Sequence, residues 1–301
     1  MKKLMQEIKK GYFGKYVENV SLRDFTTYKV GGIAKVIVYP KDVEQLIKLL
    51  KQIRQKNIKY KVLGNGSNLL FSDKMYDGVL IKLDEFNNLE LNGTSITVGA
   101  GYSLMKLAAV ATRKSLAGLE FAAGIPGTIG GAVFMNAGAY KSDMGYIVKK
   151  VKVLTPDFTI ISMTNRELNF HYRSSFFQRH PDFICLEATL SLRVGQKDKL
   201  QEVIKDRKQR RLNEQPLEYP SAGSVFRNPE GMSSGKLIDD LGLKGLSKGD
   251  AQISEKHANF IINRGNARAV DIKELMEFTK SLVKEKYNID LKIEQEFVNW
   301  E

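Results

Sequence analysis

The sequence predicts a mixed α+β protein of two or three domains. Strand-like and helix-like patterns alternate along the chain, two glycine-rich segments interrupt them, and the length of 301 residues exceeds one typical hydrophobic core. The apolar fraction of 43% is ordinary for a globular protein, and no apolar run is long enough to span a bilayer.

The first part of the chain predicts a helix followed by a strand–helix–strand unit. Residues 1–20 indicate a short amphipathic helix rather than a secretory signal, because they contain no apolar core region. Residues 33–39 form the first strand pattern, and residues 59–63 form the second. Between them, Asp42 is placed to cap a helix that reaches about residue 57, with Gln45 as its capping-box partner.

The middle of the chain predicts short strands around one helix. Ser103 begins this helix and Gly118 closes it. Strands are expected at residues 79–83, 95–98, 147–154, 158–163 and 183–194, and the third and fourth of these form a hairpin. The single cysteine, Cys185, falls in the last strand, where we expect a buried small hydrophobe and no disulfide.

The pattern changes after residue 195. A charged helix is expected at residues 199–213, and a polar, glycine-dotted stretch extends to about residue 249. A strand at 259–263, a helix at 272–287 that Asp271 and Glu274 cap, and a final strand at 291–298 complete the chain. We therefore expect three lobes: residues 1–83 (rejoined by 291–301), 84–195 and 196–290.

Two glycine-rich segments indicate phosphate binding. One is Gly64–Asn68, directly after a strand, and the other is FAAGIPGTIGGAVFMNAGAY at residues 121–140. Such backbone can approach a phosphate closely, although tight turns between packed elements would have the same composition. The dinucleotide fingerprint is not met because Leu69 replaces its third glycine, and the P-loop is absent because Leu237 replaces its hydroxyl residue.

The net charge of +13 calls for an anionic partner. No RNA-binding signature is present, and the densest basic run, residues 205–211, fits the solvated face of a helix. Small phosphate-bearing ligands explain the charge as well as nucleic acid does. Three histidines and one cysteine leave no metal-ligand cluster.

Four further patterns carry residues with chemical potential. They are FTTYKVGG at residues 25–32, HYRSSFF at 171–177, SAGSVFRNP at 221–229 and IEQEF at 293–297. Arg173 between aromatic rings can present a rigid fork to a carboxylate or phosphate, or can simply pack its stem on the rings. Small residues around Ser224 let a ligand reach its hydroxyl, and Glu294 and Glu296 would share one face of a strand.

In this order, these patterns closely resemble the UDP-N-acetylenolpyruvoylglucosamine reductases. The resemblance rests on FTTYKVGG, VLGNGSNLLFSD, AGIPGTIGGAVFMNAGAY, YRSSFF, SAGSVFRNP, GKLIDDLGLKG and EQEF, and the run HANFIIN resembles the branch without an inserted tyrosine loop. One departure lies in the last strand. Family members often read E-P-E-V-R where this chain has Glu294-Gln295-Glu296-Phe297-Val298, so Glu294 stays an alternative to Glu296 as the catalytic carboxylate.

The resemblance implies an α+β FAD-binding fold of the vanillyl-alcohol oxidase (PCMH) type in two lobes, with a C-terminal α/β substrate-binding domain at 196–290. It implies non-covalent FAD, since neither glycine loop has a histidine or cysteine. The implied cofactor-binding residues are Tyr28, Gly64, Asn65, Gly66, Ser67, Asn68, Leu69, Gly124, Ile125, Pro126, Gly127, Thr128, Gly130, Gly131, Ala132, Asn136, Ala137 and Gly138.

The implied reaction is reduction of UDP-N-acetylglucosamine enolpyruvate by NADPH in peptidoglycan precursor synthesis. Arg173 and Glu296 would stabilise charge on the substrate carboxylate, Glu296 only in protonated form or through a shared proton, and Ser224 would donate a proton to carbon. Substrate contacts are implied for Tyr172, Arg227, Asn228 and His257. We expect a cytoplasmic monomer that binds neither nucleic acid nor membrane. The alternatives are an oxygen-using oxidase or dehydrogenase of this fold and a basic nucleic-acid-binding protein.

Overall fold

The computed structural model describes all 301 residues, which form two compact units. Unit 1 comprises Met1–Glu18, Val36–Asn65 and Gly78–Gln209, and unit 2 comprises Asn19–Lys35, Gly66–Asp77 and Arg210–Glu301. Each unit has its own hydrophobic core. None of the helices is both long enough and apolar enough to cross a bilayer.

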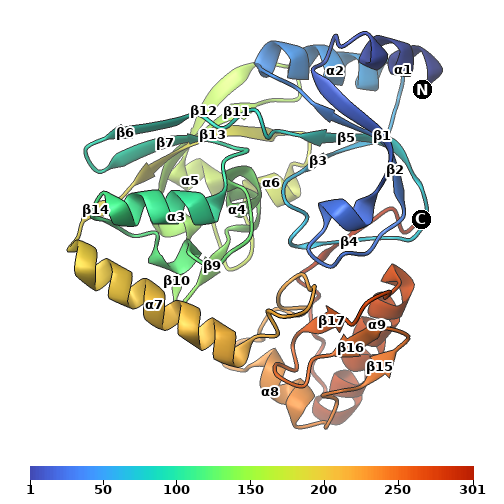
Figure 1. The fold of residues 1–301 in the computed structure, drawn as a ribbon, viewed down its shortest axis with the longest axis vertical. Coiled ribbons are helices and arrows are strands. Elements are labelled where there is room, and N and C mark those ends of the chain that lie inside the picture. Colours follow the sequence, from blue (N-terminus) through green and yellow to red (C-terminus); the bar gives the residue numbers. More distant parts are fainter. The chain divides into compact units, whose positions relative to one another are not determined.

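Unit 1 is built around a five-stranded antiparallel sheet (Figure 1). Its strands, in spatial order, are β12 (Ile160–Thr164), β11 (Val148–Leu154), β13 (Ile184–Ser191), β7 (Ser95–Gly99) and β6 (Leu89–Asn92). The helices of this unit are α1 (Lys2–Lys9), α2 (Val43–Gln55), α3 (Leu104–Arg113), α4 (Ile129–Met135), α5 (Asn165–Leu168) and α6 (Phe176–Arg179). The hairpin expected around Pro156 is confirmed by the pairing of β11 with β12.

A four-stranded sheet contains the predicted strand–helix–strand unit. Its order is β1 (Lys15–Ser21), β2 (Ile33–Tyr39), β5 (Tyr76–Lys82) and β3 (Tyr60–Leu63), with β3 and β5 parallel. The predicted Asp42 cap is confirmed, because its carboxylate accepts the Gln45 N–H at 2.9 Å. The reciprocal bond differs from a capping box, since the Gln45 side chain accepts from the N–H of Lys41.

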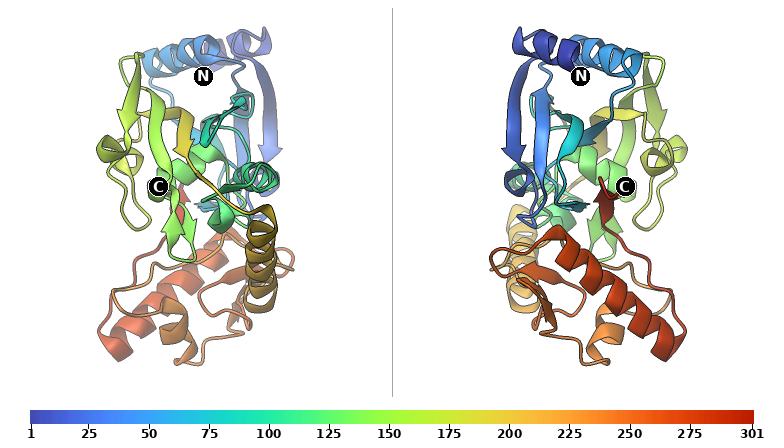
Figure 2. Two further views of the ribbon diagram at one scale, coloured as in Figure 1. Left: turned by 90° about the vertical axis from the view of Figure 1, so that its left-hand side faces the viewer. Right: turned by 90° about the vertical axis from the view of Figure 1, so that its right-hand side faces the viewer.

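The predicted N-terminal helix, α1, is confirmed and packs on the core of unit 1. Its buried residues are Leu4 and Ile8, and Figures 1 and 2 show it side by side with α2. Two short pairs complete the strands here: β9 (Gly138–Ala139) with β10 (Ser142–Asp143), and β8 (Leu116–Ala117) with β14 (Arg193–Val194). Cys185 is buried in β13 as expected, and burial raises the pKa of its thiol to about 12.

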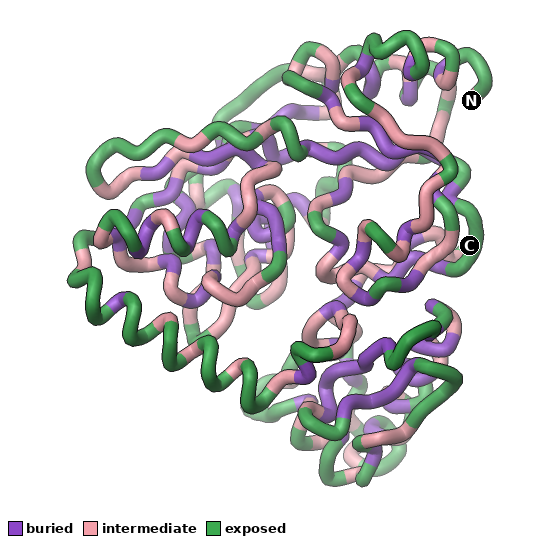
Figure 3. The backbone as a smooth tube through the Cα atoms, viewed as in Figure 1, coloured by how far each residue is buried: buried purple, intermediate pink, exposed green.

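Unit 2 combines a long helix with short strands. The helix α9 (Ala269–Tyr287) packs on a three-stranded sheet of β15 (Ser247–Lys248), β16 (Ala251–Ile253) and β17 (Ile261–Asn263) (Figure 2). The short helix α8 (Ser234–Asp239) precedes this sheet, and a parallel pair joins β4 (Leu69–Phe71) to β18 (Glu296–Val298). The charged helix α7 (Lys197–Glu214), predicted at 199–213, belongs to unit 1 up to Gln209. It is buried only at Leu200, and most of its other residues are exposed (Figure 3).

Two predicted helix ends are wrong, because segments distant in the sequence decide where these helices begin or end. The helix from Ser103 ends at Arg113, not at Gly118, because Leu116 and Ala117 pair with β14 and Ser115 turns the chain in a left-handed conformation (φ 57°). The helix expected to begin after Asp271 begins at Ala269. Asp73, distant in sequence, accepts the N–H groups of Ala269 and Val270 and so supplies the cap.

Three predicted strands are shorter or broken. The strand expected at 183–194 is divided into β13 and β14, and the one at 259–263 is reduced to β17. The final strand, expected at 291–298, is β18 alone, because residues before Glu296 bond to the segment around Val225 instead of β4.

Candidate functional site

The two glycine-rich loops meet within unit 1 where strand β3 ends. A Cβ atom added at Gly64 would lie 2.8 Å from Thr128 Oγ1, so this contact admits no side chain. The Asn65 side chain donates to the carbonyl of Pro126 at 3.2 Å. Two segments 60 residues apart in sequence, which composition alone marked as phosphate loops, are therefore packed against each other.

Backbone hydrogen bonds fix the second loop. The N–H groups of Ile129 and Gly130 donate to the carbonyls of Tyr102 and Ala100 at 2.9 and 2.8 Å. The N–H of Gly131 donates to the Thr128 hydroxyl at 3.3 Å. Since these N–H groups are engaged, the fit of this loop to a ligand rests on its lack of charged side chains and on its glycines rather than on a full set of available donors.

A buried lysine supports the first loop. Lys82, on β5, has a side chain only 10% exposed, and its ammonium lies 3.3 Å from the Asp84 carboxylate. It donates to the carbonyl of Gly64 at 2.8 Å. Sequence reasoning missed this residue, although a lysine within an apolar strand is unusual enough to be a signal.

Arg173 and the Asn136–Gly138 segment, predicted separately, come together in unit 1. The Arg173 guanidinium donates to the carbonyl of Gly138 at 2.9 Å and lies over the ring of the exposed Tyr172 at 5.2 Å. The buried side chain of Asn136 donates to the carbonyl of His171 at 2.8 Å and accepts from Gly145. Arg173 therefore lies in a turn with left-handed backbone (φ 53°), and the Gly138 carbonyl and the Tyr172 ring orient its guanidinium.

In unit 2, the segment around Ser224 is held between two others. The side chain of Asn259 accepts from the N–H of Phe226 at 2.9 Å and donates to the carbonyl of the same residue at 2.8 Å. On the other side, the N–H of Glu294 donates to Val225, and the N–H of Arg227 donates to Lys292. The structure therefore brings the Ser224 segment beside the one that contains Glu294 and Glu296.

The two candidate glutamates differ in backbone environment. Glu296 begins β18, and its N–H donates to the carbonyl of Asn68 at 3.0 Å. Glu294 lies before the strand, where its carbonyl accepts from the Asn68 side chain at 3.2 Å. The expectation that both point to one face of a strand is wrong, because the strand starts only at Glu296.

The other predicted residues of unit 2 lie near the Ser224 segment. Asn228 accepts the N–H of Ser234 at 3.0 Å, and the Arg227 Nε atom is buried without a hydrogen-bond partner. His257 Nδ1 accepts the N–H of Asn259 at 3.1 Å, and burial lowers the pKa of its imidazole. Tyr28, predicted to contact the cofactor, is fully buried, and its hydroxyl donates to Gln295 at 3.0 Å.

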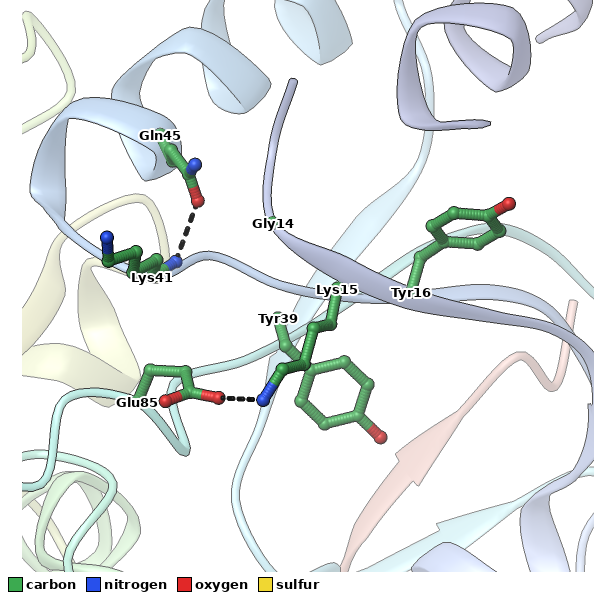
Figure 4. Close-up of a pocket in the computed structure, with 7 residues that line it drawn as sticks. All are labelled: Gly14, Lys15, Tyr16, Tyr39, Lys41, Gln45 and Glu85. Carbon is green, nitrogen blue, oxygen red and sulfur yellow. Dashed lines mark hydrogen bonds and ion pairs between the residues drawn. The ribbon is translucent and has the colours of Figure 1, made fainter. Parts of the chain in front are cut away.

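A surface pocket of about 670 Å³ in unit 1 contains none of the predicted site residues. Figure 4 shows its lining, which consists of Gly14, Lys15, Tyr16, Tyr39, Lys41, Gln45 and Glu85. Lys15 and Glu85 are paired across it at 3.1 Å. We assign this pocket no ligand.

Comparisons with known proteins identify the family. The FAD binding domain family matches residues 34–164, and the family "UDP-N-acetylenolpyruvoylglucosamine reductase, C-terminal domain" matches residues 215–298. The UDP-N-acetylenolpyruvoylglucosamine reductase of Halalkalibacterium halodurans is 46% identical over 299 residues, which cover 99% of both chains. That of Bacillus subtilis is 44% identical over the same length and coverage. This chain belongs to the UDP-N-acetylenolpyruvoylglucosamine reductase family.

A solved structure supports the same assignment. The crystal structure of UDP-N-acetylenolpyruvylglucosamine reductase from Thermus caldophilus matches with a TM-score of 0.80 and 38% identity, over 94% of this chain and 98% of that one. The resemblance and the expected fold, an FAD-binding fold with an additional C-terminal domain, are thus confirmed. As a member of this reductase family, the chain is an FAD-dependent oxidoreductase.

The residues of the chain fit FAD. The Thr27 Oγ1 atom is buried without a hydrogen-bond partner, directly beside Gly66, whose carbonyl accepts the Thr27 N–H at 3.3 Å. No acidic residue occurs in 64–69 or 124–138 to repel a pyrophosphate. A buried hydroxyl that can donate and two loops without negative charge suit a diphosphate cofactor.

Sequence reasoning missed the buried amides of this reductase. Asn259, Asn263 and Gln295 are each at most 4% exposed. The side chain of Asn263 donates to the carbonyl of Tyr28 at 3.0 Å and accepts from the N–H groups of Gly265 and Ala267. A signal was present, since Asn259 and Asn263 flank the apolar residues 260–262, and amides buried beside such runs are hydrogen-bonded as a rule.

Proposed function

We propose that this protein reduces UDP-N-acetylglucosamine enolpyruvate to UDP-N-acetylmuramate, with NADPH as the hydride donor and FAD bound non-covalently. The observation that carries the proposal is the identity of 46% over 99% of both chains to an enzyme named for this substrate. The product is a precursor of peptidoglycan, and we propose that the protein acts as a monomer in the cytoplasm.

Bound FAD supplies the chemistry of accepting hydride from NADPH and delivering it to the methylene carbon of the enolpyruvyl group. We assign Gly64–Leu69, Gly124–Ala132 and Asn136–Gly138 to the cofactor. Residues 1–83 with 291–301 and residues 84–195 would form the two FAD-binding lobes, and residues 196–290 would bind the UDP-sugar.

Arg173 would stabilise negative charge that develops on the substrate carboxylate. Its guanidinium is already oriented by the Gly138 carbonyl and the Tyr172 ring, so little reorganisation is needed when charge develops. Glu296 would assist only in protonated form or through a shared proton, because a second negative charge would oppose the first.

Ser224 would donate the proton to the carbon next to the carboxylate. A serine hydroxyl is a weak acid, so this role requires a strongly basic carbon and a fixed geometry. The bonds from Asn259 and from residues 292–294 to residues 225–227 support such fixation. Tyr172, Arg227, Asn228 and His257 are proposed substrate contacts, and the unpartnered Nε of Arg227 suits an anionic group.

An anaerobic visible spectrum tests the proposal. Purified protein should show flavin bands that bleach with NADPH and return on addition of UDP-N-acetylglucosamine enolpyruvate. Bands that bleach but return only with oxygen would instead indicate an oxidase or dehydrogenase of this fold. A colourless protein that FAD cannot reconstitute, and that binds RNA with a steep salt dependence, would overturn the proposal.

A further inference from the structure

Gln295 is a buried amide at the centre of unit 2. Its side chain is 4% exposed and meets the fully buried Tyr28, whose hydroxyl donates to Gln295 Oε1 at 3.0 Å. The Gln295 Nε2 atom faces three successive backbone carbonyls, those of Ala222 at 3.3 Å, Gly223 at 3.5 Å and Ser224 at 3.4 Å. One side chain thus connects Tyr28 to the segment that carries Ser224.

Gln295 stands between Glu294 and Glu296 in the sequence. A buried glutamine destabilises the fold unless its amide is hydrogen-bonded. The contacts to Tyr28 and to residues 222–224 therefore account for the amide being tolerated here.

Tyr28 decides which way the amide points. Its backbone carbonyl is held by Asn263 at 3.0 Å, and its side chain is enclosed in the core of unit 2. Because the Tyr28 hydroxyl donates, the oxygen of the Gln295 amide must face it, and the NH2 group must face the carbonyls of residues 222–224.

The space beside Gly223 is open, so side-chain packing does not hold the backbone there. Gly223 has a positive φ of 74°, and outside its chain neighbours no atom lies within 4 Å of the position that its Cβ would occupy. Asn259 and Glu294 fix the chain only from Val225 onward. Gln295 is thus the side chain that reaches the carbonyls on both sides of Gly223.

We propose that Gln295 is a positioning residue that holds the Ala222–Ser224 backbone, and through it the Ser224 hydroxyl, in the conformation that donates the proton. Tyr28 sets the orientation of its amide. This inference rests on the proposed function, in which Ser224 is the proton donor.

The test measures the two half-reactions separately by stopped flow. In Gln295→Leu, reoxidation of the reduced flavin by UDP-N-acetylglucosamine enolpyruvate should slow about tenfold, because the donor is no longer held in place. Reduction by NADPH should stay within about twofold, since it does not use Ser224. Tyr28→Phe, which removes one hydroxyl, should slow reoxidation in the same direction and decides the question if Gln295→Leu does not fold.

Two further variants separate positioning from general packing. Gln252→Leu makes the same change at another buried amide of unit 2, one that bonds to Gly245, Ser247 and Arg264, and should leave reoxidation unchanged. In a Ser224→Ala background, Gln295→Leu should cause no further slowing, because the group that it positions is already absent.

The possible failures are distinguishable. Equal slowing of both half-reactions, or full additivity with Ser224→Ala, would overturn the positioning role. So would reoxidation of Gln295→Leu at the wild-type rate. If the substrate does not reoxidise the wild-type enzyme, the proposed function itself fails, and the role of Gln295 fails with it.

Discussion

The glycine loops of unit 1 and the Ser224 segment of unit 2 are held by different chemistry. In unit 1, bonds between backbone groups fix the second loop, as in the bond from the Gly130 N–H to the Ala100 carbonyl at 2.8 Å. In unit 2, a side-chain amide is added to the backbone bonds, with Asn259 bonding to both the N–H and the carbonyl of Phe226.

The difference has consequences for substitution. A backbone-held loop depends on residues with no side chain, as at Gly64, where a Cβ atom would lie 2.8 Å from Thr128 Oγ1. An amide-held segment depends on a few particular side chains, whose loss leaves buried backbone groups without partners. Unit 1 should therefore be sensitive to added bulk, and unit 2 to lost polar groups.

The largest effect should come from removing the Ser224 hydroxyl, which the amide-held segment carries. Ser224→Ala should slow flavin reoxidation by the enolpyruvyl sugar ~10²–10⁴-fold, as expected for the loss of a general acid, and leave reduction by NADPH nearly unchanged. Stopped-flow measurement of each half-reaction checks this. Ser281→Ala, at an exposed position of α9, is the control. Equal loss in both half-reactions would show that Ser224 shapes the pocket instead.

Removing the amide itself should destabilise unit 2. Asn259→Leu leaves the N–H and carbonyl of Phe226 buried without partners, at a cost of about 2–4 kcal/mol in the free energy of unfolding. Urea denaturation measures this difference. Asn87→Leu, at an exposed asparagine, should change it by less than about 0.5 kcal/mol. A similar value for both variants would contradict the view that amides hold the Ser224 segment.

In unit 1, the buried Lys82 adds a side-chain bond to the backbone support of the first loop. Lys82→Met should keep the length of the buried side chain but remove its bond to the Gly64 carbonyl. We expect the dissociation constant for FAD to rise about tenfold, equivalent to ~1.4 kcal/mol, in fluorescence titrations of the apoprotein. Lys152→Met removes the same charge from an exposed position of β11 and should bind FAD as the wild type does. Unaltered binding by Lys82→Met would leave backbone contacts alone responsible for the first loop.

The same contrast explains how much of the site the sequence could predict. The glycine loops were visible because close approach demands one residue type, and Gly64 and Thr128 do meet. Asn259, Asn263 and Gln295 were not recognised as supports, because an amide in the sequence does not reveal which distant backbone group it will bond. Local patterns thus marked the segments but not what holds them.

The predicted helices and strands also divide into those set by local signals and those set by distant segments. Where the signal is local, as in the Asp42 cap of α2 or the hairpin of β11 and β12, the prediction is confirmed. Where a distant segment decides, it is wrong. Asp73 moves the start of α9 to Ala269, and pairing of Leu116 with β14 ends α3 early. Tertiary partners override the intrinsic signals of caps and glycines in both cases.

The smallest effect concerns pH, and it tests whether the histidine next to the amide-held segment must stay neutral. His257 Nδ1 accepts the Asn259 N–H at 3.1 Å, so protonation would replace an acceptor by a donor. Because burial lowers the pKa of folded His257 below its ordinary value of 6.5, the unfolded chain binds the proton more readily. Neutral His257 therefore contributes fully to stability well above pH 6.5. This contribution declines as the pH falls through 6.5 toward the pKa of His257 in the folded protein. His257→Gln cannot titrate, so its unfolding free energy should fall less steeply than that of the wild type between about pH 7 and about pH 5 in urea denaturation. Parallel curves for the two proteins would mean that His257 does not couple stability to pH, and that the Asn259 clamp is indifferent to its charge.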